Sequence, residues 1–157
     1  MDIKKYLQDK GVEFTVETHV PTFTAQEVAA ADHISGYMLA KVVVIKADNR
    51  FVMAVTPAPR LIDTEKLRHI LGAETVRLAE EREMEALFPD CEVGAEPPFG
   101  HLYDLETLLD YQLALHEDIV MQAGTHRETI RMRYADYARL VRPTVADFTV
   151  PTPMPVG

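Results

Sequence analysis

The chain has 157 residues, of which 47% are hydrophobic and 26% charged, and it carries a formal net charge of −9. This length suits one domain with a single core, and the acidic balance argues against DNA binding, because non-specific contacts with nucleic acid need a basic surface. No apolar run approaches the about 20 residues that cross a bilayer, and residues 1–5 lack the apolar core of a signal peptide, so we expect a cytoplasmic protein without membrane partners.

The N-terminal third of the chain predicts a helix, a strand and a second helix. Asp2 can cap a first helix that ends near Gly11, and the alternation of residues 12–18 predicts a strand. Thr24 and Glu27 have the spacing of a capping box, with Thr24 as the N-cap. The second helix should therefore begin at this point.

Two runs rich in β-branched residues, 40–46 and 51–55, are separated by a short polar segment and predict a β-hairpin. Strand alternation places Lys41 on the same face as Val43 and Ile45. If that face lines a pocket, the Lys41 ammonium is a fixed positive charge in a partly dry place, suited to a phosphate, a carboxylate or a developing oxyanion. Alternatively, Lys41 extends from the end of the strand into water.

The remainder of the chain alternates between helices and strands. Asp63 can cap a helix that ends at Gly72. The further elements that we expect are a strand at 75–79, an acidic helix at 80–87, a strand at 107–110 with a short helical turn after it, strands at 119–123 and 127–133, and a helix at 134–141. The apolar spacing of 105–109 also fits a helix. Residues 148–155 hold too many prolines for a helix and predict a tail or an extended strap.

Two glycine-containing segments are candidates for a ligand site. Residues 93–100 contain two glycines and two prolines, which predicts a constrained loop. Glycine allows close backbone approach, so N–H groups of this loop could face a ligand, although the loop could also be a connector. The second segment is the turn Gly124-Thr125-His126.

Other catalytic patterns are missing from the sequence. There is no HExxH, Walker or GxSxG motif, and the six histidines have no paired ligand spacing. Cys91, the single cysteine, has no second cysteine for a disulfide or a zinc site. Acidic residues crowd 80–96 and arginines crowd 127–142. These two segments are either solvated charged faces or, for the arginines, a local contact for a polyanion.

Several motifs occur in an order that resembles a known family. They are Thr22-Phe23-Thr24-Ala25-Gln26-Glu27, Ala40-Lys41-Val42-Val43-Val44, Val52 to Pro57, Leu71-Gly72-Ala73, Gly94 with Pro98 four residues later, and Ala123-Gly124-Thr125-His126. Each motif alone is weak, but the ordered set resembles the YbaK/prolyl-tRNA-synthetase-associated editing domain family over residues 1–142.

This resemblance implies a single α+β domain with a mixed, mostly antiparallel, curved or barrel-like sheet flanked by helices, followed by a proline-rich tail at 143–157. It implies a freestanding aminoacyl-tRNA deacylase that hydrolyses the ester of a mischarged tRNA in trans, without a metal or a cofactor. The implied partners are the acceptor end of the tRNA and an aminoacyl-tRNA synthetase. The implied site consists of Lys41 and Gly94 as catalytic residues and of Thr22, Phe23, Val42, Pro98, Gly124, Thr125 and His126 as substrate-binding residues.

The implied chemistry needs no covalent nucleophile. An aminoacyl ester is already activated, so a site that holds a water and stabilises the tetrahedral oxyanion can hydrolyse it. In the family reading, a hydroxyl of the terminal adenosine assists the water, Lys41 holds the phosphate or carbonyl end, and N–H groups near Gly94 face the developing charge. A small pocket would accept alanine- or cysteine-sized groups by size. Gln122 and His126 depart from some members at the turn that borders this pocket.

Two other functions remain open from the sequence. The same pocket could bind an aminoacyl or nucleotide ligand without turnover, as a partner of a synthetase. A small structural domain is the third possibility, and it would place Lys41 in bulk solvent.

Overall fold

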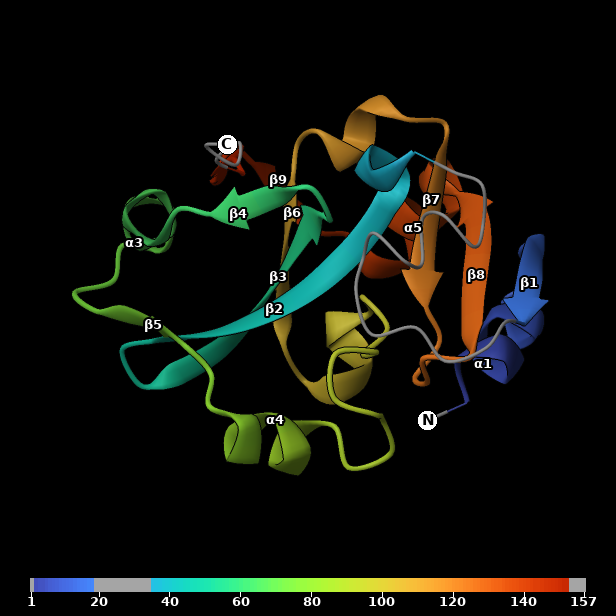
Figure 1. Ribbon diagram of the computed structural model, residues 1–157, viewed down its shortest axis with the longest axis horizontal. Helices are drawn as coiled ribbons and strands as arrows, with labels where there is room; N and C mark the ends of the chain where they lie inside the picture. Colours follow the sequence, from blue (N-terminus) through green and yellow to red (C-terminus); the bar gives the residue numbers. More distant parts are fainter. Residues whose placement is uncertain (1, 19–34, 153–157) are drawn as a thin grey trace, which may run out of the picture.

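The computed structural model describes residues 2–18 and 35–152, and a mixed β-sheet is the central layer of this part of the chain (Figure 1). The strands follow the order β1-β8-β7-β2-β3-β6-β9, and β5 pairs with β2. Their bounds are β1 Phe14–Thr18, β2 Leu39–Ala47, β3 Arg50–Pro57, β5 Val76–Leu78, β6 Glu106–Asp110, β7 Asp118–Gln122, β8 Glu128–Arg133 and β9 Thr144–Ala146. A two-stranded sheet consists of β4 (Arg60–Ile62) and β10 (Thr149–Pro151).

The helices lie around this sheet. Their bounds are α1 Ile3–Asp9, α3 Thr64–Leu71, α4 Glu81–Leu87 and α5 Tyr134–Val141, with 3-10 turns η1 Gly36–Met38, η2 Gly100–Tyr103 and η3 Leu113–Leu115. In Figure 1, α3 and α4 lie at the end of the sheet that contains β5, and α1 lies at the β1 end. The expected α+β domain with a mixed sheet flanked by helices is confirmed. Thr22, Phe23 and the capping box at Thr24 lie outside the described residues.

Local signals at the helix ends explain why several of these helices form where the sequence places them. The Asp2 side chain accepts hydrogen bonds from the N–H groups of Lys4 and Lys5 at the start of α1, as an N-cap does. The Asp63 carboxylate does the same for α3, which ends at Gly72 with a left-handed φ of 62°. The strand at 107–110 and the helical turn after it are confirmed by β6 and η3.

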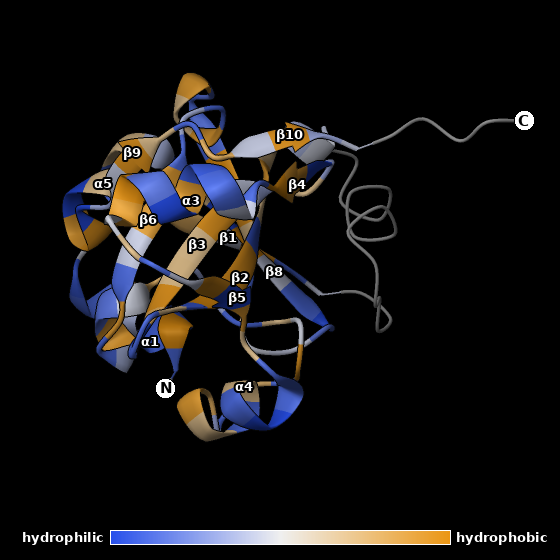
Figure 2. Ribbon diagram, turned by 90° about the vertical axis from the view of Figure 1, so that its left-hand side faces the viewer, coloured by the Kyte–Doolittle hydropathy of each residue, from blue (hydrophilic) through white to orange (hydrophobic). Residues whose placement is uncertain are grey.

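The β2–β3 hairpin forms the centre of the fold. The two strands pair in antiparallel register from Ala40 opposite Pro57 to Ala47 opposite Arg50. The two faces of β2 pack into different apolar clusters, because alternate side chains point to opposite faces of a strand: Val44 lies in the larger cluster and Ile45 in the smaller one. Leu67 of α3 covers the smaller cluster, and Figure 2 shows the hydrophilic outer surface of this helix above the apolar strand β3.

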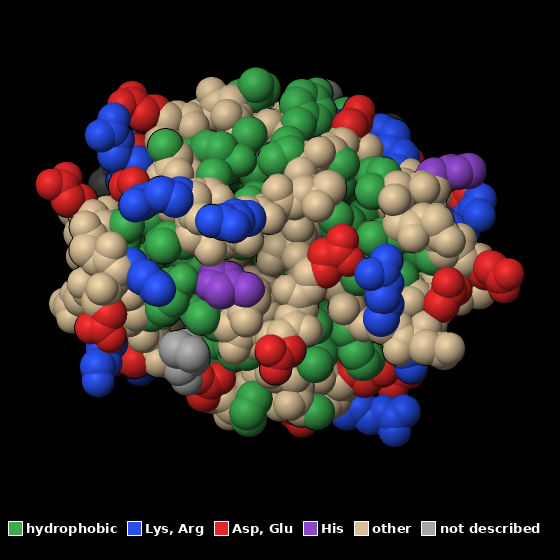
Figure 3. All heavy atoms as spheres, turned by 180° about the vertical axis from the view of Figure 1, so that it is seen from behind, with side chains coloured by type: hydrophobic (Ala, Val, Ile, Leu, Met, Phe, Trp, Pro, Cys, Tyr) green, Lys and Arg blue, Asp and Glu red, His purple; other side chains and the backbone are tan. Residues whose placement is uncertain are grey.

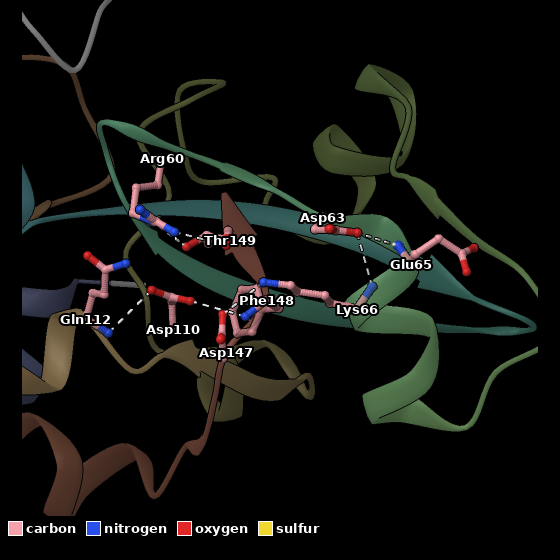
Figure 4. A network of polar contacts seen from close by, with 9 residues as sticks. All are labelled: Arg60, Asp63, Glu65, Lys66, Asp110, Gln112, Asp147, Phe148 and Thr149. Atoms are coloured by element: carbon pink, nitrogen blue, oxygen red, sulfur yellow. Dashed lines mark hydrogen bonds and ion pairs between the residues drawn. The ribbon is translucent and has the colours of Figure 1, made fainter. Parts of the chain in front are cut away.

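Residues that follow α5 belong to the packed fold. β9 pairs in parallel with β6, and β10 pairs in antiparallel fashion with β4. Between these strands Phe148 is completely buried, and its N–H donates to the buried Asp110 carboxylate at 3.3 Å (Figure 4). The division at residue 142 therefore does not coincide with a structural boundary, because 144–151 is an extended strap whose apolar side chain fills the core. Asp110 has a structural role here, as an acceptor for backbone N–H groups.

Candidate functional site

Strand β2 changes its neighbour part-way along one edge. Its first residues pair with β7, through Leu39 opposite Val120 and Ala40 opposite Met121, and its last three residues pair with β5. The carbonyl of Val44 accepts the N–H of Ala79 on the β5 side. Within the part of the chain that the structure describes, residues 41–43 thus have no strand neighbour on this edge. Because backbone groups of alternate residues point to the same edge, the N–H and C=O of Val42 point into this opening.

Lys41 stands beside the opening, and its side chain is exposed. It follows Ala40, the last residue of β2 that pairs with β7, and it shares its face with the half-buried Val43 and the buried Ile45. The Lys41 ammonium is therefore solvent-exposed in this structure, and not partly desolvated in a pocket. An exposed ammonium at an opening of the sheet is suited to a hydrated anion such as a phosphate. Lys46, in contrast, lies 5.5 Å from the ring centroid of Phe51 in a cation–π contact.

The Gly94 loop and the Gly124 turn are joined by two backbone hydrogen bonds. The N–H of Glu92 donates to the carbonyl of Gly124, and the N–H of Gly124 donates to the carbonyl of Ala95, both at 2.8 Å. Gly94 has a φ of +87° and Gly124 one of +95°, a region that residues with a side chain rarely adopt. Gly124 follows Met121, the last residue of β7 that pairs with β2, by three positions. The loop and the turn therefore stand next to the opening at Lys41.

His126 fills the space between the turn and the loop. Its side chain is buried, with 5% of the residue exposed, and Nε2 lies 2.8 Å from the carbonyl oxygen of Val93. Since a carbonyl only accepts, Nε2 carries the proton in this contact. A Cβ atom placed on Gly94 would lie 3.5 Å from Cε1 of His126, so the imidazole packs against the bare Cα of Gly94. Thr125, the residue before it, is half-buried and its hydroxyl accepts the N–H of Arg127.

The N–H groups around Gly94 are engaged within the protein. The N–H of Gly94 donates to Oε1 of Glu96 at 3.1 Å, and the N–H of Ala95 donates to the carbonyl of Glu92 at 3.0 Å. The expectation that the amides near Gly94 face a developing charge is therefore not met by these two, because each has an internal acceptor. Gly94 itself is exposed, whereas Ala95 and Glu96 are buried.

Glu96 is the residue that sequence reasoning missed. Only 5% of it is exposed, and burial raises the pKa of its carboxyl group although the N–H groups of Glu96 itself and of Gly94 and the nearby His126 work in the opposite direction. A carboxylate in this position costs free energy unless it is hydrogen-bonded. The available signal was its place in the Gly94–Pro98 segment, where its neighbours Ala95, Pro97 and Pro98 have no polar side-chain atoms.

Pro98 holds the other end of this loop. It is buried, and its carbonyl accepts the hydroxyl of the completely buried Tyr137 on α5 at 2.7 Å. Burial raises the pKa of Tyr137, which keeps this hydroxyl protonated as a donor. Pro98 thus lies behind the exposed part of the loop, in the core, and it anchors the loop.

Two further candidate residues, Val42 and Cys91, pack behind the proposed site. Val42 is half-buried and packs against the larger apolar cluster. Cys91 is half-buried behind the turn, where a Cβ on Gly124 would lie 3.8 Å from its sulfur. Burial raises the pKa of the Cys91 thiol, which disfavours the thiolate that a cysteine nucleophile needs.

The arginines between 127 and 142 do not form a uniform basic patch. Three of them are paired with carboxylates: Arg131 with Asp118 at 2.9 Å, Arg133 with Glu117 at 3.6 Å and Arg139 with Asp136 at 3.2 Å. On the face seen in Figure 3, positive and negative side chains are interspersed. Arg127 and Arg142 are exposed, so a polyanion would meet isolated cations here.

Comparison with known proteins identifies the family. The family model of the aminoacyl-tRNA editing domain matches residues 19–140, which is more than half of the chain. The chain therefore belongs to the aminoacyl-tRNA editing domain family. The resemblance inferred from the ordered motifs is confirmed by this match.

Two similar proteins place this editing domain in different contexts. The multifunctional Ser/Thr-tRNA deacylase ProXp-y of Escherichia coli (strain K12) is 27% identical over 147 residues, which cover 90% of this chain and 87% of that protein. The proline–tRNA ligase of Bacillus cytotoxicus is 32% identical over 89 residues, which cover 57% of this chain and 16% of the ligase. The match thus spans most of ProXp-y but about a sixth of the ligase.

Solved structures share the fold of the editing domain. The hypothetical protein APE2540 superposes with a TM-score of 0.85 at 18% identity, over 96% of this chain and 100% of that one. A candidate trans-editing enzyme for prolyl-tRNA synthetase superposes with a TM-score of 0.83 at 23% identity, over 95% of both chains.

Among residues 2–18 and 35–152, no helix is long and apolar enough to cross a membrane. In the same ranges, no group of three or more His, Cys, Asp or Glu residues could hold a metal ion.

Proposed function

We propose that this editing domain is an aminoacyl-tRNA deacylase that acts in trans on a mischarged tRNA carrying a small amino acid. Membership of the family and the near full-length match to the deacylase ProXp-y support this activity. The structural observation that supports the proposal is the pairing of β2 with β7 just before Lys41, since β7 leads into the Gly124 turn and this turn is hydrogen-bonded to the loop that carries the exposed Gly94. The proposed partners are the acceptor end of the tRNA and a synthetase, and we expect the protein in the cytoplasm, where tRNA is charged.

The reaction requires positioning and charge stabilisation. A water molecule adds to the carbonyl carbon of the aminoacyl ester, the bond between that carbon and the ribose oxygen breaks, and the departing ribose oxygen takes up a proton released by the water and becomes a hydroxyl. The products are a free amino acid and the uncharged tRNA. The exposed Lys41 ammonium is suited to holding a phosphate of the acceptor end, which fixes the ester relative to the Gly94 loop. Orienting the reactants in this way supplies a large share of the rate without a covalent nucleophile.

The turn and the loop limit the size of the accepted amino acid. The His126 ring fills the space beside Gly94. The side chain of a bound aminoacyl group, if it enters between the loop and β2, therefore has little room to displace the loop. Size exclusion of this kind separates substrates that differ by one methylene group by about 1–3 kcal/mol. We therefore propose alanine-sized to cysteine-sized amino acids as the substrates.

The deciding experiment is a deacylation assay of the purified protein against a panel of mischarged tRNAs, with two lysine variants. Loss of one charged hydrogen bond to phosphate costs about 1.5–3 kcal/mol, so Lys41→Ala should lower kcat/KM about 10- to 100-fold. Lys46→Ala is the matched control on the same strand and should retain wild-type activity. Absence of hydrolysis for every small amino acid, or full activity of Lys41→Ala, would exclude the proposal.

A second candidate function is a non-catalytic module that binds an aminoacyl or nucleotide ligand. It is favoured by one observation, the donation of the Gly94 N–H to Glu96, which leaves that amide unavailable to an oxyanion. Binding of an uncleavable aminoacyl-adenosine analogue without turnover of any mischarged tRNA would support this second function. Turnover of the ester would exclude it.

A further inference from the structure

One peptide unit at the candidate site is hydrogen-bonded on both of its sides. The carbonyl of Val93 and the N–H of Gly94 belong to the same peptide bond. The carbonyl accepts Nε2–H of His126 at 2.8 Å, and the N–H donates to Oε1 of Glu96 at 3.1 Å. Because a trans peptide directs its C=O and N–H in opposite directions, His126 and Glu96 hold this unit from opposite sides. Both residues are 5% exposed, so solvent competes little for either bond.

We call these two hydrogen bonds, from His126 to the Val93 carbonyl and from the Gly94 N–H to Glu96, the clamp. Without the clamp, the Val93–Gly94 peptide could rotate. Gly94 has a φ of +87°, and glycine adopts positive and negative φ with similar ease. Rotation of the Val93–Gly94 peptide would therefore meet little steric resistance from the residue that follows it. Rotation requires that the bonds to His126 and Glu96 break together, and it would leave the buried Glu96 carboxylate without the Gly94 donor.

The clamp also connects the loop with the turn. The N–H of His126 donates to Oε1 of Glu92 at 3.3 Å, and Glu92 and Ala95 are bonded to the backbone of Gly124 on either side of the clamped unit. The orientation of the Val93–Gly94 peptide is thus fixed relative to the turn and to the end of β7. Val93 and Gly94 are both exposed, whereas Ala95 and Glu96 behind them are buried. The clamp therefore fixes the orientation of a surface peptide that an entering side chain would meet.

We propose that Glu96 is a positioning residue that, together with His126, fixes the Val93–Gly94 peptide and thereby sets the size limit of the aminoacyl pocket. This inference rests on the proposed deacylase function for its effect on specificity, whereas the clamp itself is independent of that function. A pocket can discriminate between substrate side chains that differ by one methylene group only if the residues that line it are held in place. Glu96 acts through Gly94 and does not itself contact the substrate.

The first test measures the clamp without any substrate. The amide signal of Gly94 is followed by NMR in the full chain as the pH is varied, in the wild type and in Glu96→Gln. The titratable groups around Glu96 are His126 on the turn, Cys91 in the loop and Tyr103 on η2. In the wild type the Gly94 amide proton should move as Glu96 ionises, with a midpoint above 4.5. Glu96→Gln should lose this step while the chain remains folded, and an unchanged titration in that variant would overturn the clamp.

The second test measures specificity. For the wild type, Glu96→Gln, Glu96→Ala and the control Glu85→Gln on the exposed side of α4, the ratio of kcat/KM is determined for two esters that differ by one methylene group. Glu96→Ala should reduce this ratio about tenfold, Glu96→Gln should restore most of it because the amide oxygen still accepts the Gly94 N–H, and Glu85→Gln should leave it unchanged.

The outcomes separate the two proposals. An unchanged ratio in Glu96→Ala, with loss of the Gly94 titration in Glu96→Gln, would overturn the role in specificity and leave the clamp intact. If the wild type hydrolyses no ester, the proposed function fails and with it the role of Glu96 in selecting the substrate. The NMR measurement would still decide whether Glu96 holds the Gly94 amide.

Discussion

The anchor of the Gly94–Pro98 loop offers a direct measurement of the contribution of one hydrogen bond to the site. In Tyr137→Phe the aromatic ring stays, and with it the edge-to-face contact with Phe99 at 5.4 Å between ring centroids. Only the hydroxyl that donates to the Pro98 carbonyl is removed. Tyr137 is completely buried, so water cannot replace the lost donor, and an unsatisfied buried carbonyl costs about 1–3 kcal/mol.

The assay is urea unfolding monitored by circular dichroism, with thermal unfolding as a second measurement. A chain of this size loses about 2–4 °C in Tm for each kcal/mol, so Tyr137→Phe should melt about 2–12 °C below the wild type. The control is Tyr111→Phe, which removes the hydroxyl of a tyrosine that is 41% exposed and should change the free energy of unfolding by less than about 0.5 kcal/mol. Equal stability of Tyr137→Phe and the wild type would refute the reasoning that the hydroxyl of Tyr137 anchors the loop.

Two further predictions concern the strap and the buried carboxylate. Phe148 is completely buried between β9 and β10, so Phe148→Ala should lower the free energy of unfolding by about 3–5 kcal/mol; a loss below about 1 kcal/mol in urea unfolding would mean that residues 144–151 add little to the core. Burial raises the pKa of Glu96 above its ordinary value of 4.5, so the folded wild type binds this proton more tightly than the unfolded chain. The contribution of Glu96 to the stability of the wild type therefore falls as the pH rises from 4.5 through the raised pKa. Glu96→Gln does not titrate and should gain stability relative to the wild type across that window, and urea unfolding at several pH values would contradict this if the difference stayed constant or narrowed.

Much of the fold is readable from the sequence because its signals are local. Asp63 and Gly72 mark the two ends of α3 by their own side-chain and backbone chemistry. The β2–β3 hairpin follows from two β-branched runs around a short polar segment, and alternation assigns Val44 and Ile45 to opposite faces. The ordered motifs also suffice to identify the family, which the family model confirms.

The structure altered the sequence-based interpretation at three points. Lys41 is exposed rather than held in a dry pocket, which changes its proposed role towards binding a phosphate. The amide of Gly94 has an internal acceptor, so it does not offer a free donor to an oxyanion. Residues 144–151 pair with β6 and β4, which favours the extended strap over the tail, the two alternatives that the prolines of 148–155 left open.

By itself, the sequence determined most of the described helices, the β2–β3 hairpin and the family to which the protein belongs, since caps, glycines and alternation act within a few residues. Only the tertiary structure decided what surrounds the candidate site. The change of neighbour along β2 depends on where β7 and β5 end, and the clamp on the Val93–Gly94 peptide joins His126 to a loop 33 residues earlier in the chain. Such contacts arise from packing between distant segments, where burial makes each polar partner obligatory, and no local pattern encodes them.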